Sequence, residues 1–234
     1  MIPFQIQTAL YQFASGIVFL HANNIIHRDI KPGNVLAYRL DLHKVSDFGC
    51  SCRLDHQHAY IHFTTCYSSP ESWQREMGLT NCGALDAVLC DSFHFGATAL
   101  FLANGDKIKF RGESDDAHSM KVRCCEQLRE KLEQCSYDVV HPVLKECLNW
   151  MPCDRPRMTQ VLDVLKKDGY IDIIEEEQEK IEMMADSALA DRQRVIMIQK
   201  YLGVTFKDAE EIHRDSTHEF HCLAQFIARH TKVE

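Results

Sequence analysis

Four polar residues in the first fifth of the sequence have the types and spacing needed for phosphoryl transfer. Asp29 is followed by Lys31 two residues later and by Asn34 after three more, and Asp47 comes thirteen residues after Asn34. A carboxylate can accept the proton of an attacking hydroxyl, and an ammonium group can neutralise charge on a phosphate. Asn34 and Asp47 carry the oxygen ligands that Mg²⁺ prefers. The spacing predicts a site that holds a phosphoryl donor and a hydroxyl acceptor together.

These residues lie in an H-R-D-x-x-x-x-N motif over residues 27–34 and a D-F-G motif over residues 47–49, which together resemble the catalytic and metal loops of protein kinases. The Lys31-Pro32 pair resembles the Ser/Thr-specific form, and Cys50 after D-F-G is similar to the Mos-type kinases. The resemblance implies ATP and Mg²⁺ as cofactors and proteins with Ser/Thr hydroxyls as substrates. It makes Asp29 the base and Lys31 a phosphate-binding group, with Asn34 and Asp47 as Mg²⁺ ligands. The alternative is a chance polar loop in an unrelated fold.

Residues 47–71 resemble an activation segment, because Ser69-Pro70-Glu71 is similar to the A-P-E motif that ends such segments in the family. Thr64 stands where Ser/Thr kinases place a threonine that contacts the catalytic Asp and Lys. Thr64, Thr65 and Ser68 are candidate phosphorylation sites, and a phosphate on this stretch could bind Arg28 and order the segment. For each threonine the alternative is a loop hydroxyl with a local hydrogen bond.

A second group of residues is expected to hold the site in place rather than to react. Residues 91–102 are apolar on nearly every side, which predicts a helix in the centre of the domain. They resemble the family's D-x-W-x-x-G helix with Phe93 in place of Trp, and this implies that Asp91 holds the backbone of the catalytic loop. Arg155, in an R-P motif, is expected to form a buried ion pair with Glu71.

Periodicity places the remaining elements around these residues and indicates a mainly α fold. Apolar residues recur every three to four positions over 4–22, which predicts a helix before the catalytic loop. Residues 35–37 and 43–45 are expected to form a short catalytic-loop hairpin. Further helices are expected at 121–134, 139–150 and 158–166. The resemblance assigns residues 1–168 to the C-terminal lobe of a protein kinase domain.

Bulk composition excludes several classes of function. Hydrophobic residues make up 45% and charged residues 26%, as in ordinary globular proteins. The net charge of −8 argues against binding to nucleic acid or to anionic membranes. We find no apolar run of about 18 residues and no secretion signal, so the eleven cysteines are expected to be reduced, mostly buried thiols in a cytoplasmic protein. The Cys and His residues over 50–62 fit no standard zinc spacing.

The sequence contains no G-x-G-x-x-G phosphate loop. In the family that loop, a strand Lys and a helix Glu belong to an N-terminal lobe, which we expect to be absent. We therefore expect this chain to be truncated and to be weakly active or inactive alone. The alternative function is a non-catalytic, kinase-like scaffold or interaction module that recruits signalling partners.

The tail, residues 169–234, differs from the rest of the chain in its acidic character. It holds 14 acidic and 8 basic residues, a net charge of −6. Its periodicity predicts an acidic helical extension, with a final helix at about 218–230. The L-G-x-T run at 202–205 resembles the middle of the death-fold domains appended to some kinases, and a generic helical extension is the alternative. Either form could bind a signalling partner.

Overall fold

The computed structural model describes six stretches of the chain, residues 3–39, 42–54, 67–76, 84–104, 117–135 and 141–166, together with residues 192, 196, 207 and 221–222. The helices are α1 (Pro3–Ala22), α2 (Pro70–Glu76), α3 (Ala84–Asn104), α4 (Ala117–Glu133), α5 (His141–Cys147) and α6 (Met158–Lys166). The strands are β1 (Ile25–Ile26), β2 (Val35–Arg39), β3 (Leu42–Val45), β4 (Cys52–Arg53) and β5 (His221–Cys222). Short 3₁₀ helices are η1 (Pro32–Asn34), η2 (Phe48–Cys50) and η3 (Pro152–Asp154). The mainly α fold expected from the sequence is therefore confirmed.

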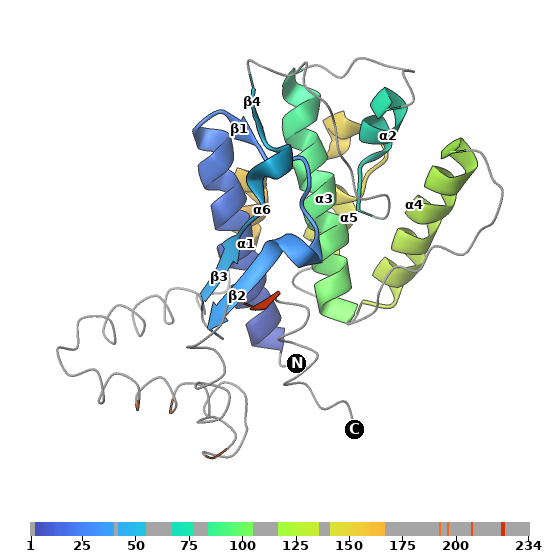
Figure 1. Ribbon diagram of the computed structural model, residues 1–234. Coiled ribbons are helices and arrows are strands. Elements are labelled where there is room, and N and C mark those ends of the chain that lie inside the picture. The colour runs from blue at the N-terminus through green and yellow to red at the C-terminus, as the bar shows by residue number, and fades with distance from the viewer. Residues whose placement is uncertain are drawn as a thin grey trace.

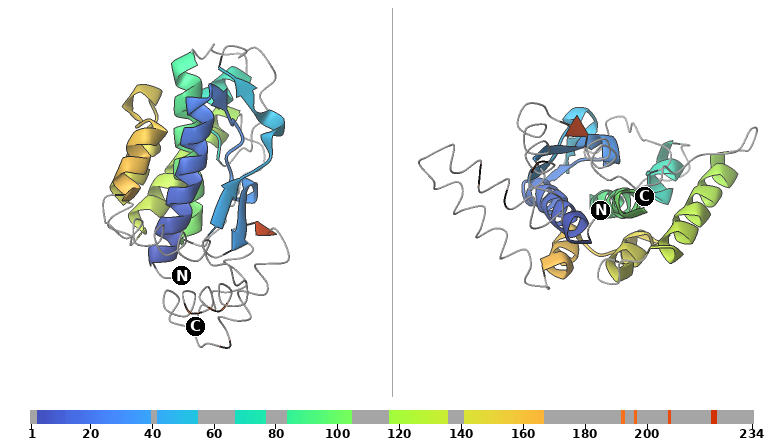
Figure 2. Two further views of the ribbon diagram at one scale, coloured as in Figure 1. Left: turned by 90° about the vertical axis from the view of Figure 1, so that its left-hand side faces the viewer. Right: turned by 90° about the horizontal axis from the view of Figure 1, so that it is seen from below.

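Helix α3 runs through the middle of the helical layer, with α1 and α6 on one side and α4 and α5 on the other (Figures 1 and 2). Nearly every described side chain from Ala87 to Leu102 is buried, which confirms the central helix predicted from its apolar sequence. Helix α3 begins seven residues ahead of Asp91, so Asp91 lies inside the helix rather than at its start.

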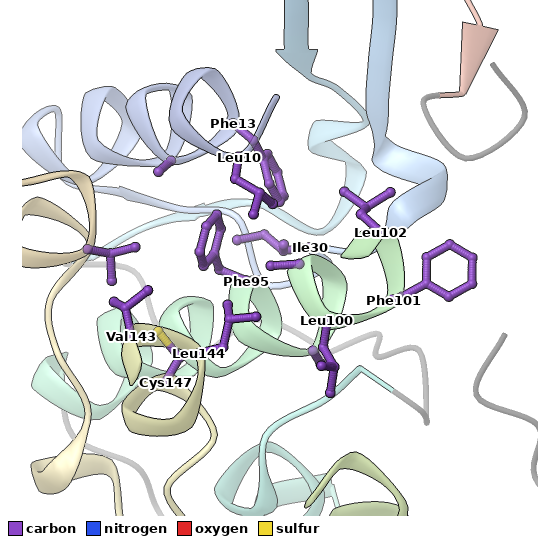
Figure 3. Close-up of a cluster of buried hydrophobic side chains, with 14 of the residues drawn as sticks. Leu10, Phe13, Ile30, Phe95, Leu100, Phe101, Leu102, Val143, Leu144 and Cys147 are labelled. Carbon is purple, nitrogen blue, oxygen red and sulfur yellow. The ribbon is translucent and has the colours of Figure 1, made fainter. Parts of the chain in front are cut away.

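The hydrophobic core joins α1, α3 and the catalytic-loop segment. Figure 3 shows Leu10 and Phe13 of α1 pointing toward Phe95 of α3 and toward Ile30 of the loop that precedes η1. The rings of Phe13 and Phe95 lie 5.4 Å apart between their centroids. Burial of side chains of this size contributes about 1.5–3 kcal/mol each to folding. The loop that carries Asp29, Lys31 and Asn34 is thus anchored by Ile30, one residue from Asp29.

Close approach of the hairpin to α1 requires a glycine in the helix. A Cβ atom at Gly16 would lie 2.7 Å from Cγ2 of Val45, the last residue of β3. Real Cβ atoms do not come this close to another carbon, so any larger residue would push the hairpin away. Because Asp47 follows Val45 by two residues, this contact helps to set where the D-F-G segment begins.

The boundaries of several elements differ from the sequence predictions. Helix α4 begins four residues before the predicted start, and α5 covers only the middle of the range predicted at 139–150. The pair β1–β4 was not predicted, since a two-residue strand has no periodicity to detect. The helix predicted at about 218–230 is wrong at two positions, because His221 and Cys222 form β5 and pair with β2. Pairing with a sheet edge outweighs helical propensity there.

His43 on β3 gives the fold a dependence on pH. Burial lowers the pKa of His43 from 6.5 to about 4, and its backbone N–H and its Nδ1 atom both lie within 3.0 Å of Oε1 of Gln12 on α1. The unfolded chain binds a proton on His43 more tightly than the folded chain does. The folded state therefore keeps its full stability above pH 6.5 and loses part of it as the pH falls toward 4. We expect the free energy of unfolding to fall by about 2 kcal/mol between pH 7.5 and 5 from this group. Urea unfolding at both values should show this loss, and His43→Leu should remove it. An equal pH slope in the variant would refute the assignment.

Candidate active site

The candidate site forms where the loop from His27 to Asn34 passes between β1 and β2. This loop contains Arg28, which has a φ of 68°, and Asp47 in the facing segment has a φ of 63°. Residues other than glycine rarely adopt this left-handed conformation, and it persists only where the surroundings hold it. Both positions therefore need supporting contacts, and these contacts determine the shape of the site.

Two of the four residues singled out for chemistry, Lys31 and Asn34, contact the carboxylate of a third, Asp29. Nζ of Lys31 lies 2.6 Å from Oδ2 of Asp29. The Nδ2 amide of Asn34 donates to the same oxygen at 3.2 Å and to the backbone oxygen of Asp29 at 2.8 Å. Asp29 and Asn34 are 7% and 5% exposed, whereas Lys31 is half-buried. A carboxylate held by two donors in this way has a defined orientation toward an incoming hydroxyl.

The fourth residue, Asp47, is brought to Asn34 by the β2–β3 hairpin. The backbone N–H and the hydroxyl of Ser46 both donate to the backbone oxygen of Asn34, at 2.9 and 3.0 Å. Asp47 follows directly, is exposed, and accepts a bond from the backbone N–H of Gly49 at 3.3 Å. The hairpin predicted at 35–37 and 43–45 is confirmed, with a longer first strand, and it places the two oxygen-bearing residues in adjacent segments.

The donor set of this pair fits Mg²⁺. Because Nδ2 of Asn34 is engaged with Asp29, its carbonyl oxygen is the atom left to meet a cation, and the exposed Asp47 adds a carboxylate. Within the described residues, no group of three or more His, Cys, Asp or Glu could hold a metal ion. Two protein ligands are typical for Mg²⁺, which keeps waters and takes its other oxygens from a bound phosphate. The Asn34–Asp47 pair therefore suits a Mg²⁺ ion that takes its remaining oxygen ligands from outside the protein.

His27 connects the loop to the segment that carries Asp47, a role that the sequence analysis did not assign to it. Its side chain is fully buried, and Nε2 lies 3.0 Å from the backbone oxygen of Ser46. Nδ1 accepts from the backbone N–H of Asp29 at 3.3 Å. These contacts fit a neutral ring with its proton on Nε2, which links Asp29 to the residue before Asp47. The signal was present in the sequence, since His27 opens the H-R-D motif.

Asp91 supports the loop from beneath. Its carboxylate accepts the backbone N–H of His27 at Oδ2 and that of Arg28 at Oδ1, both at 2.9 Å. Nε2 of His21 lies 2.9 Å from Oδ2, and Nδ1 of His94 lies 3.8 Å from Oδ1. Burial alone would raise the pKa of Asp91, but His21, His94 and the backbone donors outweigh it and lower the pKa. The contacts predicted for Asp91 are present, and they restrain the left-handed Arg28.

Arg28 reaches the first part of the activation segment. Its Nε donates to the backbone oxygen of Cys50 at 2.5 Å. Burial raises the pKa of the Cys50 thiol, and the nearby carboxylates of Asp29 and Asp47 add to the effect, so this thiol is protonated at neutral pH. Thr64 and Thr65 lie outside the described residues, and the expectations for them stay predictions.

Glu71 and Arg155 form the buried ion pair that the sequence predicted. The two nitrogens of the Arg155 fork each bond one carboxylate oxygen of Glu71, with Nη2 to Oε2 at 2.8 Å. Arg155 also donates to the backbone oxygens of Leu89, Asn149 and Trp150. Its guanidinium lies 4.9 Å from the ring centroid of Phe93, so the aromatic residue in the Trp position stacks on the cation. This pair ties the end of the activation segment to the segment before α6.

A model of the protein kinase domain matches residues 2–165. The chain belongs to the protein kinase family. The match runs from the start of α1 to the last turn of α6 and includes every element between them. The family assignment made from the two loop motifs is therefore confirmed, and with it the Ser/Thr type, to which the relatives belong.

Three relatives illustrate the range of similarity. A probable serine/threonine-protein kinase of Dictyostelium discoideum is 29% identical over 152 residues, which cover 65% of this chain and 9% of that protein. The proto-oncogene serine/threonine-protein kinase mos of Sus scrofa is 54% identical over 41 residues, 18% of this chain and 12% of that protein. A cell division control protein 2 homolog of Trypanosoma brucei brucei is 33% identical over 109 residues, 45% and 32% of the two chains. The matched region thus spans about a tenth of the first two relatives.

None of the helices in the described part of the chain combines the length and the apolar character needed to cross a membrane. The eight cysteines between Cys50 and Cys153 that the structure describes are all free, and five of them are buried: Cys90, Cys124, Cys125, Cys135 and Cys147. The prediction of mostly buried thiols is borne out for this part of the chain.

Proposed function

We propose that this domain transfers the terminal phosphoryl group of ATP to Ser/Thr hydroxyls of proteins. The observation that carries the proposal is the convergence of Lys31 and Asn34 on Asp29, with Asp47 one residue beyond the Ser46–Asn34 hydrogen bonds. When bound, Mg²⁺ would supply charge neutralisation between the phosphates, held by Asn34 and Asp47. The names of the relatives and the Lys31-Pro32 pair support serine and threonine as acceptors.

In this proposal each residue of the chain has a defined part. Asp29, oriented by Lys31 and Asn34, takes the proton of the acceptor hydroxyl. Lys31, 2.6 Å from Asp29, neutralises charge on the transferred group from the same side. Phosphoryl transfer depends mainly on positioning and on charge, so the contacts of His27 and Asp91 that shape the loop are part of the machinery. Because the sequence contains no G-x-G-x-x-G loop, we propose that the 234-residue chain by itself transfers this group only weakly.

We place this activity in the cytoplasm, where thiols such as those of the buried cysteines stay reduced. The net charge of −8 supports protein rather than nucleic-acid partners. The acidic tail, residues 169–234, is the region that we propose for contacts with signalling partners.

We expect Asp47→Ala to abolish or strongly weaken binding of Mg²⁺–ATP, because it removes the one carboxylate proposed as a metal ligand. Isothermal titration calorimetry with millimolar ATP, with and without Mg²⁺, measures this on the 234-residue chain. Asp163→Ala is the matched control, since it removes an exposed aspartate from α6 and should leave binding unchanged.

Transfer is then measured with Ser/Thr peptides and labelled ATP. Asp29→Asn should lower transfer about 10²- to 10⁴-fold, the usual contribution of a catalytic base, while Mg²⁺–ATP still binds. Equal binding by the Asp47→Ala and Asp163→Ala chains would exclude the proposed metal site. Absence of binding by the unmodified chain at millimolar ATP would overturn an ATP-dependent function for it and leave the scaffold alternative.

A further inference from the structure

Strand β5 begins about 55 residues after the end of α6 but lies beside the candidate site in space. Its two residues pair antiparallel with β2, Cys222 opposite Leu36 and His221 opposite Ala37. The sheet order is β3–β2–β5, so β5 occupies the edge of β2 that the hairpin leaves open (Figure 1). Both views of Figure 2 also show β5 beside this hairpin.

The position of this pairing links it to the metal-binding residues. Leu36 and Ala37 are the second and third residues after Asn34, and β5 also contacts η1, the turn that contains Asn34. Within η1 the backbone N–H of Asn34 donates to the oxygen of Lys31 at 2.9 Å. Pairing of β5 with the start of β2 therefore restrains the positions of Asn34 and Lys31 relative to Asp29.

The edge of β2 has the properties of a strand-docking surface. An unpaired strand edge presents a row of backbone N–H and C=O groups that another extended segment can satisfy, and added strands of this kind are a common mode of peptide recognition. Two described residues of β5 pair with β2, and about 55 residues separate them from the end of α6. A typical hydrogen bond contributes only about 1 kcal/mol net, so these two residue pairs by themselves favour the docked form modestly.

We propose that the edge of β2 opposite β3 is a docking surface for an extended peptide segment, and that His221 and Cys222 of the chain's own tail are its occupant. Docking couples the acidic tail to η1 and so to Asn34 and Lys31. Release of the tail frees the edge and loosens the catalytic loop. This inference deepens the proposed function and rests on it only where it assigns a metal to Asn34.

Hydrogen exchange on the full chain tests the docking. The double variant His221→Pro with Cys222→Pro lacks both backbone N–H groups and cannot pair as a strand. The matched variant His221→Val with Cys222→Thr keeps β-branched residues that suit a strand. We expect amides over residues 33–37 to exchange about tenfold faster in the proline variant than in the unmodified chain, with little change in the Val/Thr variant. Amides of α6, which lies away from β5, report whether the lobe stays folded.

Addition of a synthetic peptide of residues 217–226 to the proline variant should restore protection over residues 36–37, and a scrambled peptide should not. Unchanged exchange over residues 33–37 in the proline variant, or equal effects of the proline and Val/Thr variants, would overturn the proposal. Calorimetry with Mg²⁺–ATP on the same proteins separates the two ideas. A clear exchange response without ATP binding in any variant would support the docking surface and contradict the proposed function.

Discussion

Replacement of Arg155 by Met is expected to lower the free energy of unfolding by about 3–5 kcal/mol, because it leaves the Glu71 carboxylate buried without its partner. Glu71 is 7% exposed and would keep its contact with the thiol of Cys90 at 3.1 Å, which carries no compensating charge. Arg155 also satisfies three backbone oxygens, and these lose their donor in the same step. Urea unfolding at pH 7.5 measures the loss.

Arg157→Met is the matched control, since Arg157 has an exposed side chain two residues away and should change stability by less than about 0.5 kcal/mol. Removal of both charges in Glu71→Met with Arg155→Met should cost less than Arg155→Met alone, because no unpaired charge remains. Similar losses for the Arg155 and Arg157 variants would show that the ion pair contributes little.

The effect of Arg155→Met should also depend on pH. Burial alone would raise the pKa of Glu71, but the hydrogen bonds and charge of Arg155 lower it below 4.5 in the folded chain. The pair therefore stabilises the unmodified protein above pH 4.5, and this contribution is lost as the pH falls through the lowered pKa. Without Arg155, burial raises the pKa of Glu71, so the carboxyl can take up a proton as the pH falls. The stability difference between the two proteins should shrink on acidification.

Replacement of Asp91 by Ala is expected to lower the free energy of unfolding by roughly 3–5 kcal/mol, because one buried and one partly buried backbone N–H group lose their acceptor. These groups belong to His27 and Arg28, and the second has the left-handed φ of 68°. Loss of the carboxylate also removes the restraint on that strained residue, so the loop ahead of Asp29 should become mobile. Urea unfolding measures the first effect, and hydrogen exchange of the two amides measures the second.

Asp163→Ala again provides the control for loss of an aspartate, here on the exposed surface of α6. Asp91→Asn should fall between Asp91→Ala and the unmodified chain, since an amide offers one acceptor oxygen to the two donors. If Asp91→Ala is as stable as Asp163→Ala and the amides of His27 and Arg28 exchange at unchanged rates, the supporting role of Asp91 is wrong.

The sequence by itself determined the local elements and the identity of the family. Helix α1 was predicted from apolar residues that recur every three to four positions. Two of these residues, Phe13 and Ile17, lie on the buried face of the helix, as predicted. The catalytic and metal loops could be found because their chemistry needs particular residue types within the 19 consecutive positions from Asp29 to Asp47. The Glu71–Arg155 pair, 84 residues apart, was predicted only through the resemblance to kinases.

The tertiary structure alone decided how these parts meet. Three sets of contacts depend on how α1, α3 and the hairpin pack. They are the contact of Lys31 and Asn34 with one Asp29 oxygen, the bonds from His27 to both neighbouring segments, and the burial of His43 against Gln12. No local pattern marks such contacts, because packing brings together residues whose separation in sequence carries no signal. The same reason explains β5, where pairing with the edge of β2 produced a strand at residues predicted to be helical.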